Sequence, residues 1–352
     1  MATDLERWQA TISGERPQSI LYTADFTPDL KRRLIEHAGT EDLAGKYGFF
    51  QWAGVGPTEP PGSQKPDYGV YYAGEKLPDG TRIEGDGVAM IPGSVYHFVR
   101  HHSPLRNATR FEQIESYPIP DQSDWLVDHM HEQVRRHRAA GRVSVTWVGH
   151  MYETAWQVRG YEPFLIDMID RPEWAECMLD KLFRRNMNRA AAAARAGVDV
   201  LHCGDDVANQ NAMMFSVPMW RRFMLSRWAR VWDAARAIRP GIQIWYHTDG
   251  NAFAIVPELM DAGVTILNPV QPECMDPSEV RRLYPTLTMH GTIGTQSTMP
   301  WGKPADVKRV VRERIAACGQ AGRLVLGPTH VLEPEVPIAN IEAYAEACRE
   351  AR

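Results

Sequence analysis

Between residues 143 and 330 the sequence alternates between short apolar runs and longer amphipathic stretches, and this alternation limits the folds open to the chain more than any other feature. The runs are rich in Val, Ile and Leu, as buried strands are, and the stretches between them have the periodicity of helices. The runs are "VSVTWVGH" (143–150), "VDVLHCGDD" (198–206), "IQIWYHTDG" (242–250), "VTILNPVQ" (264–271), "LTMHGTIG" (287–294) and "LVLGPTH" (324–330). Strands that alternate with helices form parallel sheets that the helices cover. This part of the chain is therefore predicted to consist of β/α units.

Two further apolar runs near the N-terminus bring the number of predicted strands to eight. They are "SILYTADF" (19–26) and "YGFFQWAG" (47–54). Eight strands with intervening helices predict a closed (β/α)8 TIM barrel rather than an open sheet. The segment from about 53 to 120 is rich in Gly and Pro and has short β-like pieces, so we expect a hairpin-containing, lid-like insertion there. The sequence predicts a single domain over residues 1–352.

Charge and cysteine content argue against several classes of protein. The net charge of −5 and the pI near 6.2 predict no basic surface for a nucleic-acid backbone or an anionic membrane. No apolar window is long enough to span a bilayer and the N-terminus resembles no secretion signal, so we expect a cytoplasmic protein. The five cysteines are an odd number without a Cys-x-x-Cys pair, which argues against a disulfide framework and against a thiolate-rich zinc site.

Polar residues follow nearly all of the predicted strands. They are Glu153, His202, Asp205, Asp206, His247, Asp249, Asn268, Gln271, His290 and His330. Singly, they have structural explanations: a histidine can satisfy a buried hydrogen bond, either of the adjacent aspartates can cap a helix, and Asn268 can form a turn with Pro269. Glu153 can form an ion pair with Arg159. Because the carboxyl ends of barrel strands meet at one mouth, where active sites are built, the convergence of these residues predicts an enzyme.

Four segments between residues 140 and 350 carry a family signature. They are "GDDVANQNAMMFSVPMWRRFM", "YHTDGNAFAIVPELMDAGVTILNPVQ", "GTIGTQSTMPWGKPADVKRVV" and "GPTHVLEPEVPIANIEAYAEA". Together they resemble the uroporphyrinogen decarboxylase superfamily. The resemblance implies a β/α barrel and one of two chemistries. One is decarboxylation of the acetate groups of a tetrapyrrole without a cofactor. The other is methyl transfer to or from a corrinoid on a partner protein, usually with zinc.

The N-terminal region argues against a tetrapyrrole substrate. The decarboxylases carry an arginine-rich motif with an Arg-Gln-Ala-Gly-Arg core that binds the substrate carboxylates, and "SILYTADFTPDLKRRL" lacks it. Arg32 and Arg33 lie in a helix-like context that suits a solvated face. A porphyrinogen with many carboxylates needs several fixed cations, so we expect a different substrate.

The resemblance also implies a metal site. The zinc methyltransferases carry His-x-Cys after one strand and a second Cys after the last, and here these positions read His247-Thr248-Asp249 and His330. This correspondence predicts one zinc ion per chain, held by His247, Asp249 and His330 with an open position for substrate or water. Such a set suits Lewis-acid activation of an ether, amine or carboxyl oxygen. His330 matches the C-terminal histidine of the decarboxylases equally well, in which case Asp249 and His330 would be a proton-handling pair without metal.

The remaining residues at the mouth are predicted to serve the substrate. Glu153, Asp205 and Asp206 are expected to be catalytic, orienting the substrate or moving a proton. The expected substrate-binding residues are Trp147, Trp156, His202, Gln210, Asn268 and Gln271. Cys274 could reach a soft metal, whereas burial is the commoner fate of a lone cysteine such as Cys203. Tryptophans near the strand ends would suit an aromatic methyl ether by stacking or a quaternary amine by cation–π contact.

The sequence therefore predicts a zinc-dependent methyltransferase or demethylase, a homodimer as is common in the superfamily. It would move a methyl group from a methyl ether or methylamine to a corrinoid or another carrier. No cobalamin-binding Asp-x-His-x-x-Gly segment is present, so corrinoid would arrive on a separate protein. One alternative is a decarboxylase of a smaller acid, which would release carbon dioxide without a corrinoid partner. Another is a non-catalytic tetrapyrrole- or corrinoid-binding protein, which would tolerate the loss of His247 and Asp249.

Overall fold

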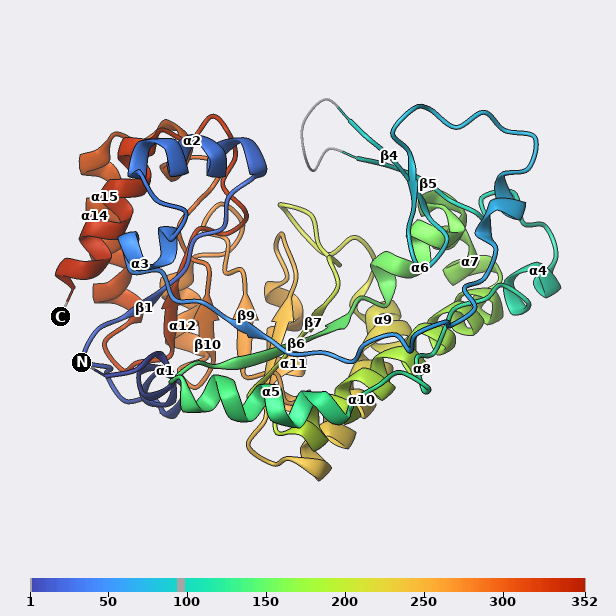
Figure 1. Ribbon diagram of the computed structural model, residues 1–352, viewed down its shortest axis with the longest axis horizontal. Helices are drawn as coiled ribbons and strands as arrows, with labels where there is room; N and C mark the ends of the chain where they lie inside the picture. Colours follow the sequence, from blue (N-terminus) through green and yellow to red (C-terminus); the bar gives the residue numbers. More distant parts are fainter. Residues whose placement is uncertain (1, 94–98, 352) are drawn as a thin grey trace.

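The computed structural model describes residues 2–93 and 99–351, and it confirms the predicted barrel (Figure 1). Eight parallel strands form one curled sheet in the order β1-β11-β10-β9-β8-β7-β6-β2. The strands are β1 (Leu21–Tyr22), β2 (Ala53–Gly54), β6 (Ser144–Gly149), β7 (Val200–Gly204), β8 (Gln243–His247), β9 (Ile266–Asn268), β10 (Thr288–His290) and β11 (Leu324–Leu326). The edge strands β1 and β2 share no ladder among the described residues. Instead, the Phe50 amide donates a hydrogen bond to the Tyr22 carbonyl at 2.8 Å, so the barrel is joined more loosely at this seam than elsewhere.

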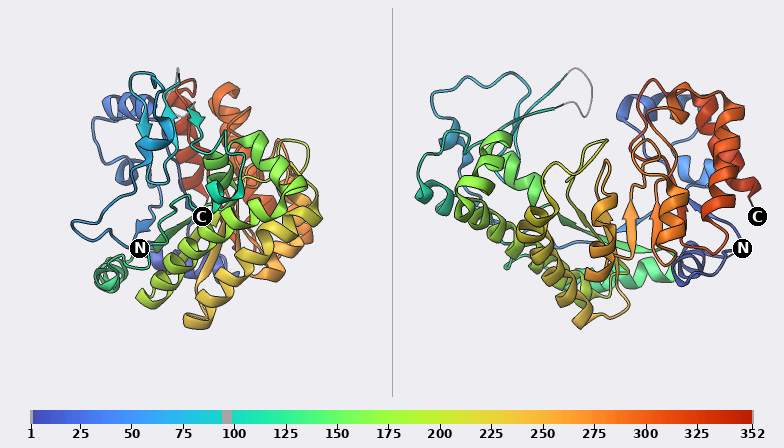
Figure 2. Two further views of the ribbon diagram at one scale, coloured as in Figure 1. Left: turned by 90° about the vertical axis from the view of Figure 1, so that its right-hand side faces the viewer. Right: turned by 180° about the vertical axis from the view of Figure 1, so that it is seen from behind.

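Helices lie on the outside of the sheet, as the alternation predicts (Figures 1 and 2). They are α1 (Asp4–Ser13), α2 (Pro28–Ala38), α3 (Leu43–Tyr47), α4 (Phe111–Glu115), α5 (Asp128–Ala139), α6 (Tyr152–Arg159), α7 (Tyr161–Asp170), α8 (Pro172–Ala196), α9 (Val217–Trp220), α10 (Ser226–Ile238), α11 (Val256–Ala262), α12 (Pro277–Leu283), α13 (Thr298–Trp301), α14 (Pro304–Cys318) and α15 (Ile338–Glu350). A π-helical turn over Arg221–Leu225 joins α9 to α10. None of the described helices is both long and apolar enough to cross a membrane.

Helix α8 shows how the sequence specifies an element that supports the mouth. Its buried alanines have high helix propensity and small side chains, so α8 can pack closely against α10. The helix ends at Gly197, whose φ of 83° is a left-handed conformation that glycine adopts without strain. The middle of α8 reaches the end of β6, since Asn186 Nδ2 donates to the His150 carbonyl at 3.4 Å and Arg189 Nη1 donates to the Val148 carbonyl at 3.2 Å.

An apolar cluster closes the amino-terminal end of the barrel. Trp8 of α1 is only 1% exposed and belongs to a cluster of buried side chains that lie in the strands or just before them: Leu21, Phe50, Val143, Val200, Trp245, Ile266 and Val325. Figure 1 shows α1 lying across this end. Since this end is filled with apolar side chains, polar chemistry is confined to the opposite, carboxyl ends of the strands.

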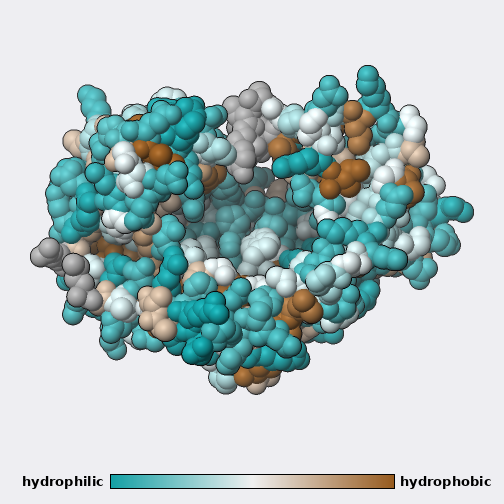
Figure 3. Space-filling view, viewed as in Figure 1, coloured by the Kyte–Doolittle hydropathy of each residue, from teal (hydrophilic) through white to brown (hydrophobic). Residues whose placement is uncertain are grey.

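The predicted insertion contains a three-stranded antiparallel sheet of β3 (Arg82–Ile83), β4 (Ala89–Ile91) and β5 (Arg100–His102). Buried tyrosines bind it together: the Tyr72 hydroxyl donates to the Gly87 carbonyl at 2.6 Å, and that of Tyr117 donates to the Asp86 carbonyl at 2.7 Å. The space-filling view is hollowed between the insertion and the C-terminal helices, above the carboxyl ends of the strands (Figure 3).

Candidate active site

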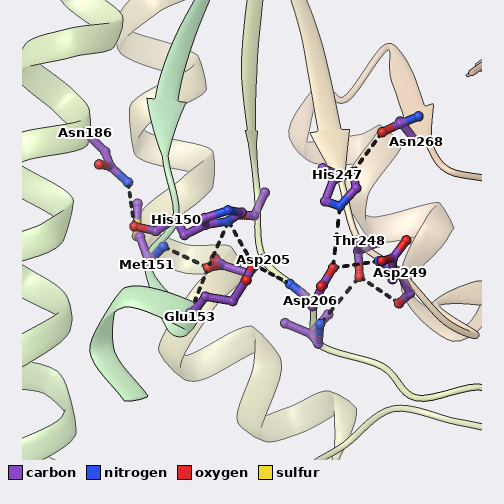
Figure 4. A network of polar contacts seen from close by, with 12 residues as sticks. His150, Met151, Glu153, Asn186, Asp205, Asp206, His247, Thr248, Asp249 and Asn268 are labelled. Atoms are coloured by element: carbon purple, nitrogen blue, oxygen red, sulfur yellow. Dashed lines mark hydrogen bonds and ion pairs between the residues drawn. The ribbon is translucent and has the colours of Figure 1, made fainter. Parts of the chain in front are cut away.

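The carboxyl ends of β6, β7 and β8 bring ionisable side chains together (Figure 4). Gly204 at the end of β7 pairs with His247 at the end of β8. A Cβ atom on Gly204 would lie 2.0 Å from the His247 carbonyl oxygen, and the φ of Gly204 is +151°. Only glycine fits this close approach without a shift of the backbone. The tight pairing fixes how the residues after Gly204 stand against His247.

Two neighbouring groups of three residues have the side chains and spacing of metal sites. We call His150, Glu153 and Asp205 the closed cluster, and Asp206, His247 and Asp249 the open cluster. In each, the ligand atoms lie within 4.8 Å of one another. The names describe how many of these ligand atoms already accept hydrogen bonds from the protein. More of them do so in the closed cluster than in the open cluster.

The protein uses both carboxylate oxygens of Asp205 in the closed cluster. Asp205 is 0% exposed. Its Oδ1 accepts hydrogen bonds from the backbone amides of Met151 at 2.8 Å and Glu153 at 3.2 Å, and its Oδ2 accepts one from Trp228 Nε1 at 2.8 Å. Asp205 therefore caps the start of α6 from a neighbouring strand and anchors it to α10. Burial raises the pKa of this carboxyl group to about 7, against the charge of His150.

His150, which sequence reasoning did not single out, forms the ionic part of the closed cluster. Its Nδ1 lies 2.8 Å from Glu153 Oε2 and also contacts the Gly204 carbonyl. Desolvation lowers the pKa of His150, but the hydrogen bond and charge of Glu153 outweigh this effect and raise the pKa to about 9. The imidazole therefore carries a proton at neutral pH. The one available signal was its position as the last residue of a predicted strand.

Glu153 links the two clusters. Its Oε2 also accepts a hydrogen bond from the Asp206 amide at 3.0 Å. The alternative ion pair between Glu153 and Arg159 does not form, because Arg159 Nε pairs with Asp167 Oδ2 at 2.6 Å, both side chains being deeply buried.

The open cluster leaves ligand atoms unused. His247 Nδ1 lies 2.8 Å from Asn268 Oδ1, which turns Nε2 toward Asp206 Oδ1 at 3.8 Å. Asp206 Oδ1 accepts a hydrogen bond from the Asp249 amide at 2.7 Å. No hydrogen bond from a described residue reaches the Asp249 carboxylate. One imidazole nitrogen and two carboxylates thus face one another with capacity for a cation.

The charges in the open cluster act in the same direction. Burial raises the pKa of Asp206 to about 6, with Glu153 and Asp249 adding to the rise and His247 opposing it. Desolvation lowers the pKa of His247, but the nearby carboxylates of Asp206 and Asp249 produce a net rise. Both rises mean that these side chains hold a proton more readily in the folded protein than in water.

A hydrogen-bond chain behind His247 fixes its orientation. Asn268 Nδ2 lies 3.2 Å from His290 Nδ1, and His290 Nε2 lies 2.9 Å from Thr23 Oγ1. Burial, with a further contribution from His247, lowers the pKa of His290 to about 3, so this ring is neutral and its Nδ1 accepts the amide proton. Asn268 Oδ1 must then accept from His247 Nδ1–H, which leaves a lone pair on Nε2. Asn268 is thus more than a turn residue before Pro269.

An aromatic layer lies beneath the open cluster. His202 of β7 stacks on Trp245 of β8 at 3.9 Å between centroids and 10° between planes. Trp147 of β6 meets His202 edge-on at 4.6 Å, and Trp52 beside β2 lies 4.9 Å from Trp245. Desolvation keeps the pKa of His202 well below its usual range, so the ring is neutral and serves as an aromatic surface. Trp147, 42% exposed, presents an apolar face to the mouth.

The other predicted site residues are spread over a wider area. Trp156 of α6 packs against His101 of β5 and Tyr161 of α7. A cavity of about 420 Å³ on the far side of the open cluster is lined by Asp249, Gln210, Gln271 and His330 among others. Cys203 is buried, as expected, and accepts a hydrogen bond from Trp232 Nε1 at 3.3 Å.

The predicted zinc ligands His247, Asp249 and His330 do not come together as one set. Among the described residues, the third ligand atom within 4.8 Å of His247 and Asp249 belongs to Asp206, and His330 and Cys274 join neither cluster. The family correspondence gave the strand end that carries His330. It did not predict whether the His330 side chain reaches His247 and Asp249. This side chain is exposed and lines the 420 Å³ cavity.

Comparisons with known proteins agree with this architecture. The family model described as uroporphyrinogen decarboxylase (URO-D) matches residues 89–351. The solved structure of a methyltransferase from Methanosarcina mazei superposes with a TM-score of 0.67 and 17% identity, covering 99% of each chain. The catalytic core of a xylanase A superposes with a TM-score of 0.41 and 13% identity, over 68% of this chain and 87% of that one. No curated protein matches the sequence. The first superposition shows a shared fold along the whole chain.

Proposed function

The chain belongs to the uroporphyrinogen decarboxylase family, and from that premise we propose that it is a zinc-dependent methyltransferase or demethylase. It takes a methyl group from a methyl ether or methylamine and passes it to a corrinoid on a separate protein. The observation that carries the proposal is the open cluster at the barrel mouth, where His247 Nε2 and the Asp249 carboxylate accept no hydrogen bond from a described residue. The full-length likeness in fold to a methyltransferase supports it.

The donors of the open cluster fit zinc. An imidazole nitrogen with two carboxylates is a ligand set that zinc accepts, and it leaves a position for another ligand. The bond from His247 Nδ1 to Asn268 is the outer contact that metal-bound histidines usually make. When bound, zinc supplies Lewis-acid activation of the heteroatom that carries the methyl group. In this proposal Asp206, rather than His330, completes the set with His247 and Asp249.

The closed cluster handles the proton that the reaction needs. When the methyl group leaves an ether, the bond between oxygen and methyl carbon breaks, the carbon bonds to the corrinoid cobalt, and the oxygen retains an electron pair that must be protonated. His150 is protonated, lines the mouth and shares its proton with Glu153. We assign this pair as the general acid. Asp205 positions it by fixing the start of α6.

The aromatic layer positions the methyl donor. Trp147 stands at the mouth beside both His150 and His202, with ring centroids 4.7 and 4.6 Å away. An aromatic donor would stack on such a surface, and a methylated ammonium group would be attracted to it. The predicted homodimer and the corrinoid-bearing partner belong to this proposal as well.

Decarboxylation of a small acid is the second candidate, and a specific observation favours it. Loss of carbon dioxide leaves a carbanion that needs a proton, and the protonated His150 lines the same cavity as two arginines. This reaction would need neither the open cluster nor a corrinoid. The two candidates therefore differ in their dependence on Asp249.

The first test is the metal content of the purified protein, before and after zinc loading. We expect about one zinc per chain in the wild type and in His150→Gln, and at least a hundredfold weaker zinc binding in His247→Ala and Asp249→Ala. Methyl transfer to added cob(I)alamin, followed by absorbance with methoxybenzenes and methylamines as donors, should be lost in the same two variants. Absence of metal from all four proteins would overturn the proposal and make decarboxylation the leading candidate.

A further inference from the structure

A second and larger cavity adjoins the closed cluster. It has a volume of about 790 Å³ and lies between the insertion and the barrel mouth. The barrel contributes Trp147 and His150, the insertion and the segment after it contribute Tyr68, Met90 and Trp125, and α8 contributes Arg185 and Arg189. The cavity therefore combines aromatic side chains with two arginines.

Arg185 is a buried cation for which the described part of the chain offers no hydrogen-bond or ion-pair partner. It is 8% exposed, and its Nε is buried without a hydrogen-bond acceptor among residues 2–93 and 99–351. Asp86, its nearest acidic influence, acts on it only at longer range. A buried charge without a partner is costly, and proteins normally pair it.

Arg189 stands one helical turn further along α8 and uses neutral partners. Its Nε donates to Gln122 Oε1 at 2.5 Å, and its Nη1 donates to the Val148 carbonyl at 3.2 Å. Its guanidinium also lies 5.9 Å from the ring of Trp125. Desolvation and the like charge of Arg185 lower the pKa of Arg189 to about 10, so Arg189 stays charged at neutral pH. Two like charges in adjacent turns destabilise the helix unless an anion lies between them.

The same helix bundle shows how the chain treats an arginine that is only structural. Arg159 of α6 is 4% exposed, but it forms an ion pair with Asp167 at 2.6 Å and also donates to the Leu105 carbonyl at 2.7 Å. Arg227 of α10 likewise pairs with Asp180 at 2.6 Å. Arg185 and Arg189 form no such ion pair with a described carboxylate, and both line the cavity instead.

We infer that Arg185 and Arg189 bind the carboxylate group of the substrate. The bond from Arg189 to Val148, two residues before His150 on β6, places this subsite directly beside the proposed general acid. The walls of Trp125 and Trp147 suit a flat or apolar body between the carboxylate and the reacting group. The substrate class is therefore a methylated carboxylic acid. The methyl group in this assignment rests on the proposed function, whereas the carboxylate rests on the two arginines alone.

Acidic residues on the cavity rim do not fill this role. Glu84 and Asp124 are exposed, and Glu59 pairs with Lys65 at 3.1 Å. Asp86 is half-buried and acts electrostatically on both arginines. It competes with a bound carboxylate, so its removal should strengthen anion binding.

The test is calorimetric binding of benzoate, with its neutral analogue benzamide as the reference ligand. We expect benzoate to bind the wild type at least tenfold more tightly than benzamide, and Arg185→Gln and Arg189→Gln each to lose this preference. Arg184→Gln, a change to an exposed arginine of the same helix, should retain it, and Asp86→Asn should strengthen benzoate binding. Arg189 is less buried than Arg185, so its variant remains informative if Arg185→Gln fails to fold.

Three results would overturn the inference: equal affinity for benzoate and benzamide, no binding of either, or unchanged benzoate binding in Arg189→Gln. Displacement of benzoate by inorganic phosphate at lower concentration would also overturn it, since the subsite would then be a phosphate site. The measurement uses the full chain without metal or corrinoid. If the protein binds benzoate but no zinc, only the proposed function is overturned. If it binds zinc but not benzoate, only this inference is overturned.

Discussion

The closed and open clusters are built from the same kinds of residue at the same barrel mouth, yet they are suited to different tasks. In the closed cluster both oxygens of Asp205 accept hydrogen bonds from the protein, and His150 shares its proton with Glu153. In the open cluster no described residue donates a hydrogen bond to the Asp249 carboxylate. Proximity of ligating residues is therefore a weak indication of a metal site. The number of lone pairs left unused is a stronger one.

The difference begins with two neighbouring aspartates. The Asp205 side chain turns into the protein toward the start of α6 and Trp228, whereas the Asp206 side chain turns toward His247. One residue is expected to determine stability and the other metal binding. The predictions below test this separation.

The largest effect is expected from Asp205→Ala. The substitution leaves three buried donors, the amides of Met151 and Glu153 and Trp228 Nε1, without their acceptor. We expect a loss of about 3–5 kcal/mol in the free energy of unfolding, measured by urea denaturation of the metal-free protein. Asp249→Ala is the matched control and should change this free energy by less than about 0.5 kcal/mol. Equal losses in the two variants would abolish the distinction between the clusters.

The closed cluster should also make stability depend on pH. The pKa of His150 is about 9 in the folded protein and near 6.5 in the unfolded chain, so its stabilising contribution is fully present below pH 6.5 and is lost as the pH rises through 9. Between pH 7 and 9 the loss should be about 2 kcal/mol in the metal-free protein. Asp206, with a pKa of about 6, titrates mostly below this range, whereas Asp205, with a pKa of about 7, adds only about 0.4 kcal/mol to the loss.

His150→Gln tests this assignment. Urea denaturation at a series of pH values should give a flatter stability curve between pH 7 and 9 for this variant than for the wild type. His129, which contacts the Gly56 carbonyl outside both clusters, provides the control: His129→Gln should keep the wild-type slope. A wild-type curve that is already flat in this range would show that His150 is not the imidazolium ion of the closed cluster.

The sequence predicted the mouth better than it predicted the clusters. Strand alternation placed His247, Asp249 and Asn268 near the strand ends, because the apolar runs give way to polar residues there. It could not separate Asp205 from Asp206, since their difference depends on Trp228 and on the start of α6, which are distant in sequence. The family correspondence named His330 as the third ligand, but ligand distance depends on which side chains reach inward from each strand end. His150 was missed because its role depends on its contact with Glu153, whose position at the start of α6 is fixed by Asp205, a residue distant in sequence.

The smallest effect is expected behind the open cluster, at Asn268. Its Oδ1 accepts from His247 Nδ1, and its Nδ2 is held by His290, so the amide orients His247 Nε2 without being a ligand itself. Asn268→Ala should weaken zinc binding about tenfold, the lower end of the range for such outer partners. Competition with a chromogenic chelator gives the affinity, and Asn251→Ala serves as control because Asn251 bonds to the Asn211 carbonyl instead of to His247. An unchanged affinity in Asn268→Ala would mean that His247 is oriented by Asp206 and Asp249 alone. The hydrogen bond from His247 to Asn268 would then contribute nothing to zinc binding.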